Sequence, residues 1–222
     1  MISPKFVLFS FSHCATLFAI VITAILLCFI IRTHPLLKNK IHFLLAAILI
    51  INKSCVFIYN LHSGVLPPNG LPLQLSDMTI FIVLITLLTG KQWSFEISYY
   101  WGFSGAVLAL LTPALKYAIP SIPAVFYFLS HGIVVISVMI FIWGEHRKPG
   151  SGSFLKAFLL MNGYACVITI FDYLFKTDYF FLMHKPEGNT LLNYFGPWPF
   201  YIIIADVLAF VIFWLLSLPF RK

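Results

Sequence analysis

Long apolar runs with almost no charged residues are the feature that most constrains this chain. Seven of them cover most of its 222 residues, at 6–31, 42–61, 73–89, 94–111, 122–143, 154–175 and 198–219. Only 9% of all residues are charged, against about 25% in soluble domains. Such a chain cannot cover itself with polar surface, so lipid must be its solvent. Because a helix of about 20 residues crosses a bilayer, we expect an all-α bundle of about seven transmembrane helices.

The segments between these runs are too short to form a soluble domain. The 62–72 loop contains Pro-Pro-Asn-Gly, a strong turn signal. The 144–153 loop is the most polar one, and residues 176–197 form the longest connection. Residues 1–222 are therefore expected to form a single integral membrane domain with short loops.

The net charge of +7 is explained by membrane topology, because most basic residues lie at helix ends. Nine of the 14 Lys and Arg lie on one side of the expected bundle and four on the other; Lys53 belongs to neither side. Cytoplasmic loops carry the excess of positive charge. We therefore expect a multi-pass protein of a bacterial cell membrane, with the N-terminus outside and the C-terminus in the cytoplasm.

Composition and motifs also restrict the partners. The basic residues are too scattered for a nucleic-acid surface, so membrane phospholipids are the expected partners, and nothing in the sequence identifies a protein partner. The four cysteines lie in apolar runs without C-x-x-C spacing, which predicts buried thiols and no disulfide or zinc site: Cys14, Cys28, Cys55 and Cys166. We expect no metal and no other cofactor.

Polar side chains inside the apolar runs are the candidates for function, because ionisable groups at membrane depth are costly. Counting along each helix places six such residues in the outer half of the bilayer, so the expected polar cavity opens toward the outer leaflet. These residues are His13, Lys53, Ser76, Asp77, His131 and Asp206.

Two interpretations of these residues remain open. In the structural one, Lys53 pairs with Asp206 or Asp77, His13 makes a hydrogen bond between helices, and Ser76 only packs. In the functional one, a serine nucleophile uses a histidine base. That pattern is compatible with acyl transfer or lipid hydrolysis, in which Asp77 or Asp206 orients a histidine and His13 is a second polar contact.

Several motifs resemble those of the YwaF-like integral membrane protein family, which is related to the eukaryotic transmembrane acyltransferases that remodel ether phospholipids. The most specific of them is Gly-Pro-Trp-Pro-Phe-Tyr at 196–201. Others are Leu-Pro-Leu-Gln-Leu-Ser-Asp at 71–77, Tyr-Trp-Gly-Phe-Ser-Gly-Ala at 100–106, Leu-Leu-Thr-Pro at 110–113, Ser-His-Gly at 130–132 and Phe-Ser-His at 11–13. The resemblance covers most of the chain.

The resemblance implies a chemistry for two residues. The family pattern is L-P-L-x-L-C-D, and in the eukaryotic branch its cysteine is the proposed nucleophile, with a histidine of the fifth helix as partner. Ser76 stands in place of that cysteine and His131 matches the histidine. The chain also departs from the family pattern at Lys53, where an acidic residue is more usual, and at Asp206, where Glu is usual. Serine either acts as the acyl nucleophile with His131 as its base, or this branch lacks the activity.

The leading prediction is thus a membrane-embedded acyltransferase or lipid hydrolase acting on phospholipid acyl chains, with Ser76 as nucleophile and His131 as general base. An enzyme of this kind should show a Ser–His hydrogen bond in a pocket open to lipid. The alternative is a small non-enzymatic transporter or lipid-binding membrane protein, in which a Lys53–Asp206 pair acts as a gate or staple. A transporter should show a water-lined path that reaches both faces.

Overall fold

A computed structural model describes residues 4–186 and 190–220 and shows an all-α polytopic membrane bundle. Each of the seven predicted apolar runs is helical. The helices are α1 (Phe11–Thr33), α2 (Lys38–His62), α3 (Leu75–Thr89), α4 (Gln92–Trp101), α5 (Val107–Leu111), α6 (Ile122–Met139), α7 (Ser153–Phe175) and α8 (Phe200–Ser217). A π-helical segment, Gly102–Ala106, joins α4 to α5 into one continuous helix, and a second, Ile140–Gly144, extends α6. Arg221 and Lys222, counted above for topology, lie outside the described residues.

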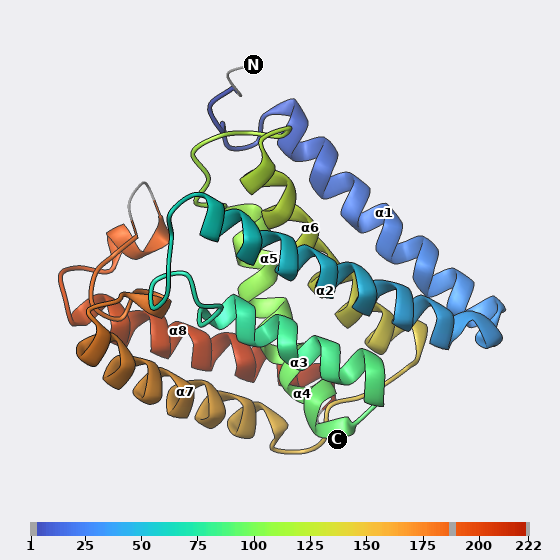
Figure 1. Cartoon of the computed structure of the whole chain (residues 1–222). Helices are drawn as coiled ribbons and strands as arrows, with labels where there is room; N and C mark the ends of the chain where they lie inside the picture. The colour runs from blue at the N-terminus through green and yellow to red at the C-terminus, as the bar shows by residue number, and fades with distance from the viewer. Residues whose placement is uncertain (1–3, 187–189, 221–222) are drawn as a thin grey trace.

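Five of the described helices are long and apolar enough to cross a membrane by length and composition. These are the helices that contain α1, α2, α6, α7 and α8, while α3 is apolar but has only 15 residues. In Figure 1, α1 and α2 lie on one side of the bundle and α7 and α8 on the other, with α3 to α6 between them. The α4–α5 helix is central because it packs against α3 and α7 and, through its π segment, against α6.

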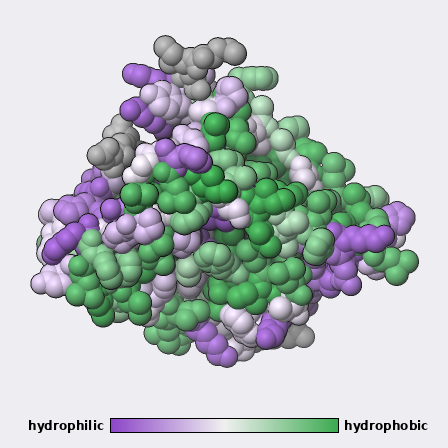
Figure 2. Space-filling view, viewed as in Figure 1, coloured by the Kyte–Doolittle hydropathy of each residue, from purple (hydrophilic) through white to green (hydrophobic). Residues whose placement is uncertain are grey.

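The outer surface of the bundle is apolar, as a lipid solvent requires. Figure 2 shows hydrophobic side chains across the middle of the visible face and hydrophilic ones toward its edges. Large side chains that would be costly to expose to water are open on several helices, among them Phe11 at 90%, Phe43 at 70% and Val167 at 62% exposure. The folded surface is therefore apolar, as expected for a chain whose solvent is lipid.

One half of the bundle, around the ends of α3, α4 and α6 nearest Gly90 and Gly144, is tightly packed. Its largest fully buried side chains include Phe95, Tyr100, Phe141 and Phe213. Hydrogen bonds join several of its polar side chains; the Tyr100 and Ser153 oxygens, for example, lie 3.1 Å apart. This packing leaves the other half of the bundle as the place for a cavity.

A buried carboxylate joins helices α2 and α6 at the packed end. Glu145 follows the π segment of α6, and its oxygens lie 2.9 Å from Lys38 Nζ and 2.6 Å from His42 Nε2. The His42 contact lacks the alignment of a hydrogen bond, so we treat it as a close electrostatic contact. Burial raises the pKa of Glu145, but Lys38 and His42 outweigh that effect and hold the pKa below its usual range. The charged carboxylate therefore stabilises this end at neutral pH.

Gly102 allows the central helix to approach α6. A Cβ atom at this position would lie 2.8 Å from Val138 Cγ2 and 3.3 Å from Val134 Cγ1. Distances this short force a shift in a packed interior, so the glycine is required by packing.

We predict that Gly102→Leu destabilises the protein by about 1–3 kcal/mol, the usual cost of overpacking a core. Gly163→Leu is the matched control, because Gly163 is exposed on α7 and a Cβ there meets no heavy atom within 4 Å. Thermal unfolding in detergent should give a clearly lower midpoint for the Gly102 variant and a near-native one for the control. Equal midpoints would contradict the close approach of the two helices.

Candidate functional site

A large cavity occupies the half of the bundle near the N-terminus of α3. Its volume is about 1550 Å³, and residues of α2, α3, α5, α6, α7 and α8 line it. Pockets for drug-sized ligands measure about 300–1,000 Å³, so this space suits a larger, lipid-sized molecule. The lining is mainly apolar, but it includes five of the six polar residues predicted from sequence: Lys53, Ser76, Asp77, His131 and Asp206.

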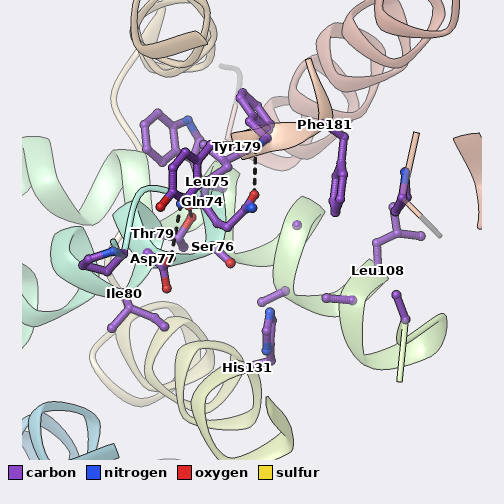
Figure 3. A pocket seen from close by; sticks show the side chains of 18 of the residues that line it. Gln74, Leu75, Ser76, Asp77, Thr79, Ile80, Leu108, His131, Tyr179 and Phe181 are labelled. Carbon is purple, nitrogen blue, oxygen red and sulfur yellow. Dashed lines mark hydrogen bonds between the residues drawn. The ribbon is translucent and has the colours of Figure 1, made fainter. Parts of the chain in front are cut away.

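The first turn of α3 brings Ser76 and Asp77 to the cavity wall. Asp77 Oδ2 accepts a hydrogen bond of 3.1 Å from the backbone N–H of Gln74, which is the residue before the helix. A side chain that satisfies a free N–H in this way stabilises a helix start. Figure 3 shows Ser76 and Asp77 on the α3 side of the pocket and His131 on the α6 side.

Lys53 forms an ion pair with Asp77, which links α2 to α3. Both side chains are largely buried, with exposures of 19% and 11%. This contact confirms the prediction that Lys53 pairs with a carboxylate, and of the two candidates it selects Asp77. The Lys53–Asp206 pair of the alternative interpretation is not formed. Asp77 therefore has two roles, since one oxygen starts α3 and the other neutralises Lys53.

A backbone carbonyl fixes the orientation of His131. The Nδ1–H group donates a 2.8 Å hydrogen bond to the Tyr127 carbonyl one turn earlier, and the two rings lie 4.2 Å apart between centroids. Donation from Nδ1 leaves Nε2 as the acceptor of a neutral imidazole. The Tyr127 carbonyl thus takes the orienting role that the sequence had suggested for Asp77 or Asp206.

Ser76 and His131 line the same cavity but are not hydrogen-bonded to each other. Among residues 4–186 and 190–220, no hydrogen bond links the two side chains, so the predicted Ser–His bond is absent from this state of the protein. Catalytic hydrogen bonds are often long in unliganded sites and tighten when substrate binds. What the two residues share in the structure is the cavity that both of them line.

Asp206 lines the cavity from α8. Its Oδ1 accepts a 3.0 Å hydrogen bond from Asn162 Nδ2, which joins α7 to α8. Asn162 Nδ2 also donates to the Phe158 carbonyl at 3.2 Å. Asn162 is not among the residues predicted from sequence, although a carboxamide in the middle of an apolar run indicates a polar partner.

His13 is not part of the cavity, contrary to its predicted role as a second polar contact. It is 2% exposed, and both of its ring nitrogens are used. Nδ1 accepts from the Phe9 N–H at 3.1 Å, and Nε2 donates to the Leu110 carbonyl at 2.9 Å. His13 therefore joins α1 to the end of α5, which is the structural interpretation given for it above.

A folded segment after α7 closes the cavity near the α3 N-terminus. Asp172 is buried and accepts hydrogen bonds from the Thr177 hydroxyl at 2.6 Å and from the Tyr179 N–H at 3.0 Å. The Tyr179 hydroxyl donates to the Pro68 carbonyl and accepts from the Leu71 N–H at 2.9 Å. Burial raises the pKa of Tyr179, which favours the protonated phenol that this donation requires.

Two consecutive phenylalanines in this segment have unusual backbone angles. Phe180 has a φ of 60° and Phe181 a φ of 54°, a region that bulky residues rarely adopt. The Phe180 N–H donates to Gln74 Oε1 at 2.8 Å, and the Phe181 carbonyl accepts from the Tyr201 hydroxyl at 2.7 Å. Such strain persists only where surrounding contacts fix it. Gln74, part of the 71–77 motif, thus holds both the start of α3 and this segment, a role that sequence analysis missed.

Comparisons with known proteins give one match. A family model described as the TMEM164 family matches residues 8–217. A search of curated proteins and a search of solved structures each found no significant match.

We predict that Lys53→Met is more destabilising than the double change Lys53→Met with Asp77→Asn. Removing only the lysine leaves a buried carboxylate without its partner, which typically costs about 3–5 kcal/mol. The double variant has no such charge, and asparagine still accepts a hydrogen bond at a helix start. Thermal unfolding in detergent measures the order of stability, with exposed Lys156→Met as control. A single variant as stable as the double one would argue against a coupled pair.

Proposed function

The chain belongs to the TMEM164 family of membrane proteins, and we propose that it is a membrane-embedded acyltransferase or lipid hydrolase acting on phospholipid acyl chains. The observation that carries the proposal is that the Ser76 hydroxyl and the oriented His131 imidazole line one lipid-sized cavity. Ser76 is the nucleophile and His131 the general base. The resemblance to the YwaF-like proteins and the ether-phospholipid acyltransferases supports this assignment, since Ser76 and His131 occupy the positions of their proposed cysteine and histidine.

The first half of the reaction transfers the acyl group to serine. His131 Nε2 takes the proton from the Ser76 hydroxyl as Oγ attacks the carbonyl carbon of a phospholipid ester. The negative charge that develops on the carbonyl oxygen lies near the first turn of α3, where the positive end of the helix dipole favours an anion. The bond from carbon to the glycerol oxygen then breaks, and the proton on His131 passes to that oxygen. The products are an acyl-serine and a lysophospholipid.

The second half decides between the two activities. A hydroxyl group attacks the acyl-serine while His131 takes its proton, and that proton returns to Ser76 as the ester breaks. If the hydroxyl belongs to water, a fatty acid leaves and the protein is a hydrolase. If it belongs to a lysophospholipid, a new phospholipid forms and the protein is an acyltransferase.

The ion pair Lys53–Asp77 supports this chemistry indirectly. It fixes α2 against α3 one residue from Ser76, so the nucleophile is attached to a rigid turn. The alternative function is a lipid-binding membrane protein without chemistry, and the same ion pair favours it as a structural staple. Covalent labelling of Ser76 separates the two functions.

We predict that a serine-directed fluorophosphonate labels the purified protein in detergent. Labelling should vanish in Ser76→Ala and fall by about a hundredfold in His131→Ala, since general-base assistance contributes about 10²–10⁴-fold. Ser76→Cys should react at least as readily with a thiol-directed probe, because a thiolate forms more easily than an alkoxide. Mass spectrometry of the labelled peptide measures each case.

Ser104→Ala is the control for this experiment. Ser104 also lines the cavity, but its hydroxyl donates to the Tyr100 carbonyl at 2.6 Å, so its loss should leave labelling unchanged. Labelling that persists in Ser76→Ala would remove serine 76 from the proposed mechanism. The lipid-binding alternative would then be preferred.

We further propose that the protein lies in a bacterial cell membrane with its N-terminus outside and its C-terminus in the cytoplasm, as the basic residues suggest. Cysteines introduced at Lys148 and at His184 test this orientation in a variant without the exposed Cys14 and Cys166. A membrane-impermeant maleimide should label position 184 in intact cells and position 148 only after the membrane is opened. The reverse result would turn the cavity toward the cytoplasmic leaflet.

A further inference from the structure

One face of the continuous α4–α5 helix runs along the cavity. Trp101, Gly105 and Ala109 follow one another at four-residue intervals and all line the cavity wall. Residues spaced in this way lie near one side of an α-helix, where each step advances about 6 Å along the axis; the rise is smaller within the π segment at 102–106. The three residues therefore lie at successive depths along the cavity.

Trp101 closes the deep end of this face. Its indole N–H donates a 3.1 Å hydrogen bond to the Ala157 carbonyl of α7, and its side chain is 4% exposed. Met161, one turn further along α7, is also buried and lines the cavity beside it. Below them lies the packed half of the bundle described above. The indole is thus held in place as a floor.

Gly105 leaves the middle of the face open. A Cβ atom built at this position meets no heavy atom within 4 Å, and the residue is exposed to the cavity. Gly102, in the same π segment, differs because a Cβ there would lie 2.8 Å from Val138. Packing therefore explains Gly102 but does not explain Gly105. What Gly105 provides is empty space directly above the floor.

Small residues of α8 also line the cavity. Ala205 and Ala209 of α8 lie one turn apart and both line the cavity. The polar groups beside these small residues already have partners, since Asp206 accepts from Asn162 and Ser104 donates to the Tyr100 carbonyl. The remaining lining near Gly105 is mainly apolar. A saturated hydrocarbon chain is the ligand that such a space fits, since it gains from burial and needs no hydrogen bond.

We propose that Gly105 sets the longest acyl chain that the cavity admits, with Trp101 as the floor that the chain end reaches. The proposal rests on the proposed function only in placing the ester end of the chain at Ser76. A bulky side chain at position 105 raises the floor by one helical step of about 6 Å, which corresponds to roughly four or five methylenes. Position 105 is thus a specificity-determining position and not a catalytic one.

Photo-crosslinking tests the proposal without requiring turnover. The probes are phosphatidylcholines whose acyl chain carries a diazirine at its end, with a long chain of about 16 carbons or a short one of about 10. The protein carries Ser76→Ala and is reconstituted in nanodiscs. We expect the long probe to label Trp101 or Met161. Gly105→Phe should reduce that labelling about tenfold by steric exclusion, while labelling of cavity residues above position 105 by the short probe should change less than about twofold.

Two further variants make the result specific. Gly163→Phe adds the same side chain at an exposed glycine of α7 that does not line the cavity, and it should leave both labelling patterns unchanged. Ala109→Phe blocks the face one step nearer the α3 N-terminus, so it should also exclude the short probe. It keeps the test decisive if Gly105→Phe fails to fold, which a thermal unfolding curve reveals.

The outcomes separate this proposal from the proposed function. Equal long-probe labelling in the Gly105→Phe and Gly163→Phe proteins would overturn the chain-length role, and so would an unlabelled floor in the starting protein. If the floor is labelled as expected but Ser76 never reacts with a fluorophosphonate, the enzymatic proposal fails while the chain-binding role of Gly105 stands. If Ser76 reacts and the variants show no length dependence, the enzymatic proposal stands while the chain-binding role of Gly105 fails.

Discussion

A lysine in the middle of a transmembrane helix must find its partner inside the protein, because hydrocarbon offers none. Lys53 meets this constraint through Asp77, and the rest of the site follows from that choice. The same carboxylate accepts the backbone N–H that precedes α3, so the position of α2 and the start of α3 depend on one group. Ser76 precedes Asp77 in the chain, so the contacts of Asp77 also fix the position of Ser76. The energetic cost of an unpaired charge at membrane depth therefore requires the ion pair that fixes the position of the candidate nucleophile.

The seven helical segments could be predicted from sequence because membrane burial imposes a pattern that short stretches reveal on their own. The presence of a partner for Lys53 was predictable for the same reason. Which carboxylate it takes was not, because Asp77 and Asp206 are equally plausible until α2, α3 and α8 are placed in space. Likewise His13 and His131 look alike in sequence. The two histidines differ in role because His13 bonds to the Leu110 carbonyl and His131 to the Tyr127 carbonyl. The position of a backbone carbonyl cannot be read from a sequence.

Other parts of the site were hidden for a different physical reason. The π segment at 102–106 and the positive φ angles of Phe180 and Phe181 are local deviations that tertiary contacts impose. Propensity argues against both, since bulky residues avoid positive φ. Gln74 and Tyr201 hold the strained turn through side-chain hydrogen bonds that cross from other elements. Sequence motifs pointed to the right neighbourhood, at 71–77 and 196–201, but not to these contacts.

The replacement of cysteine by serine places more of the proposed chemistry on the histidine. A thiol can reach its reactive thiolate with little help near neutral pH, whereas a hydroxyl stays protonated and must lose its proton during attack. The base then has to present the correct nitrogen before the reaction begins. Donation from His131 Nδ1 to the Tyr127 carbonyl does this, because it makes Nε2 the acceptor nitrogen of the neutral imidazole. A carbonyl partner orients the ring without adding a charge, and the ion pair Lys53–Asp77 that lines the same cavity is neutral in sum.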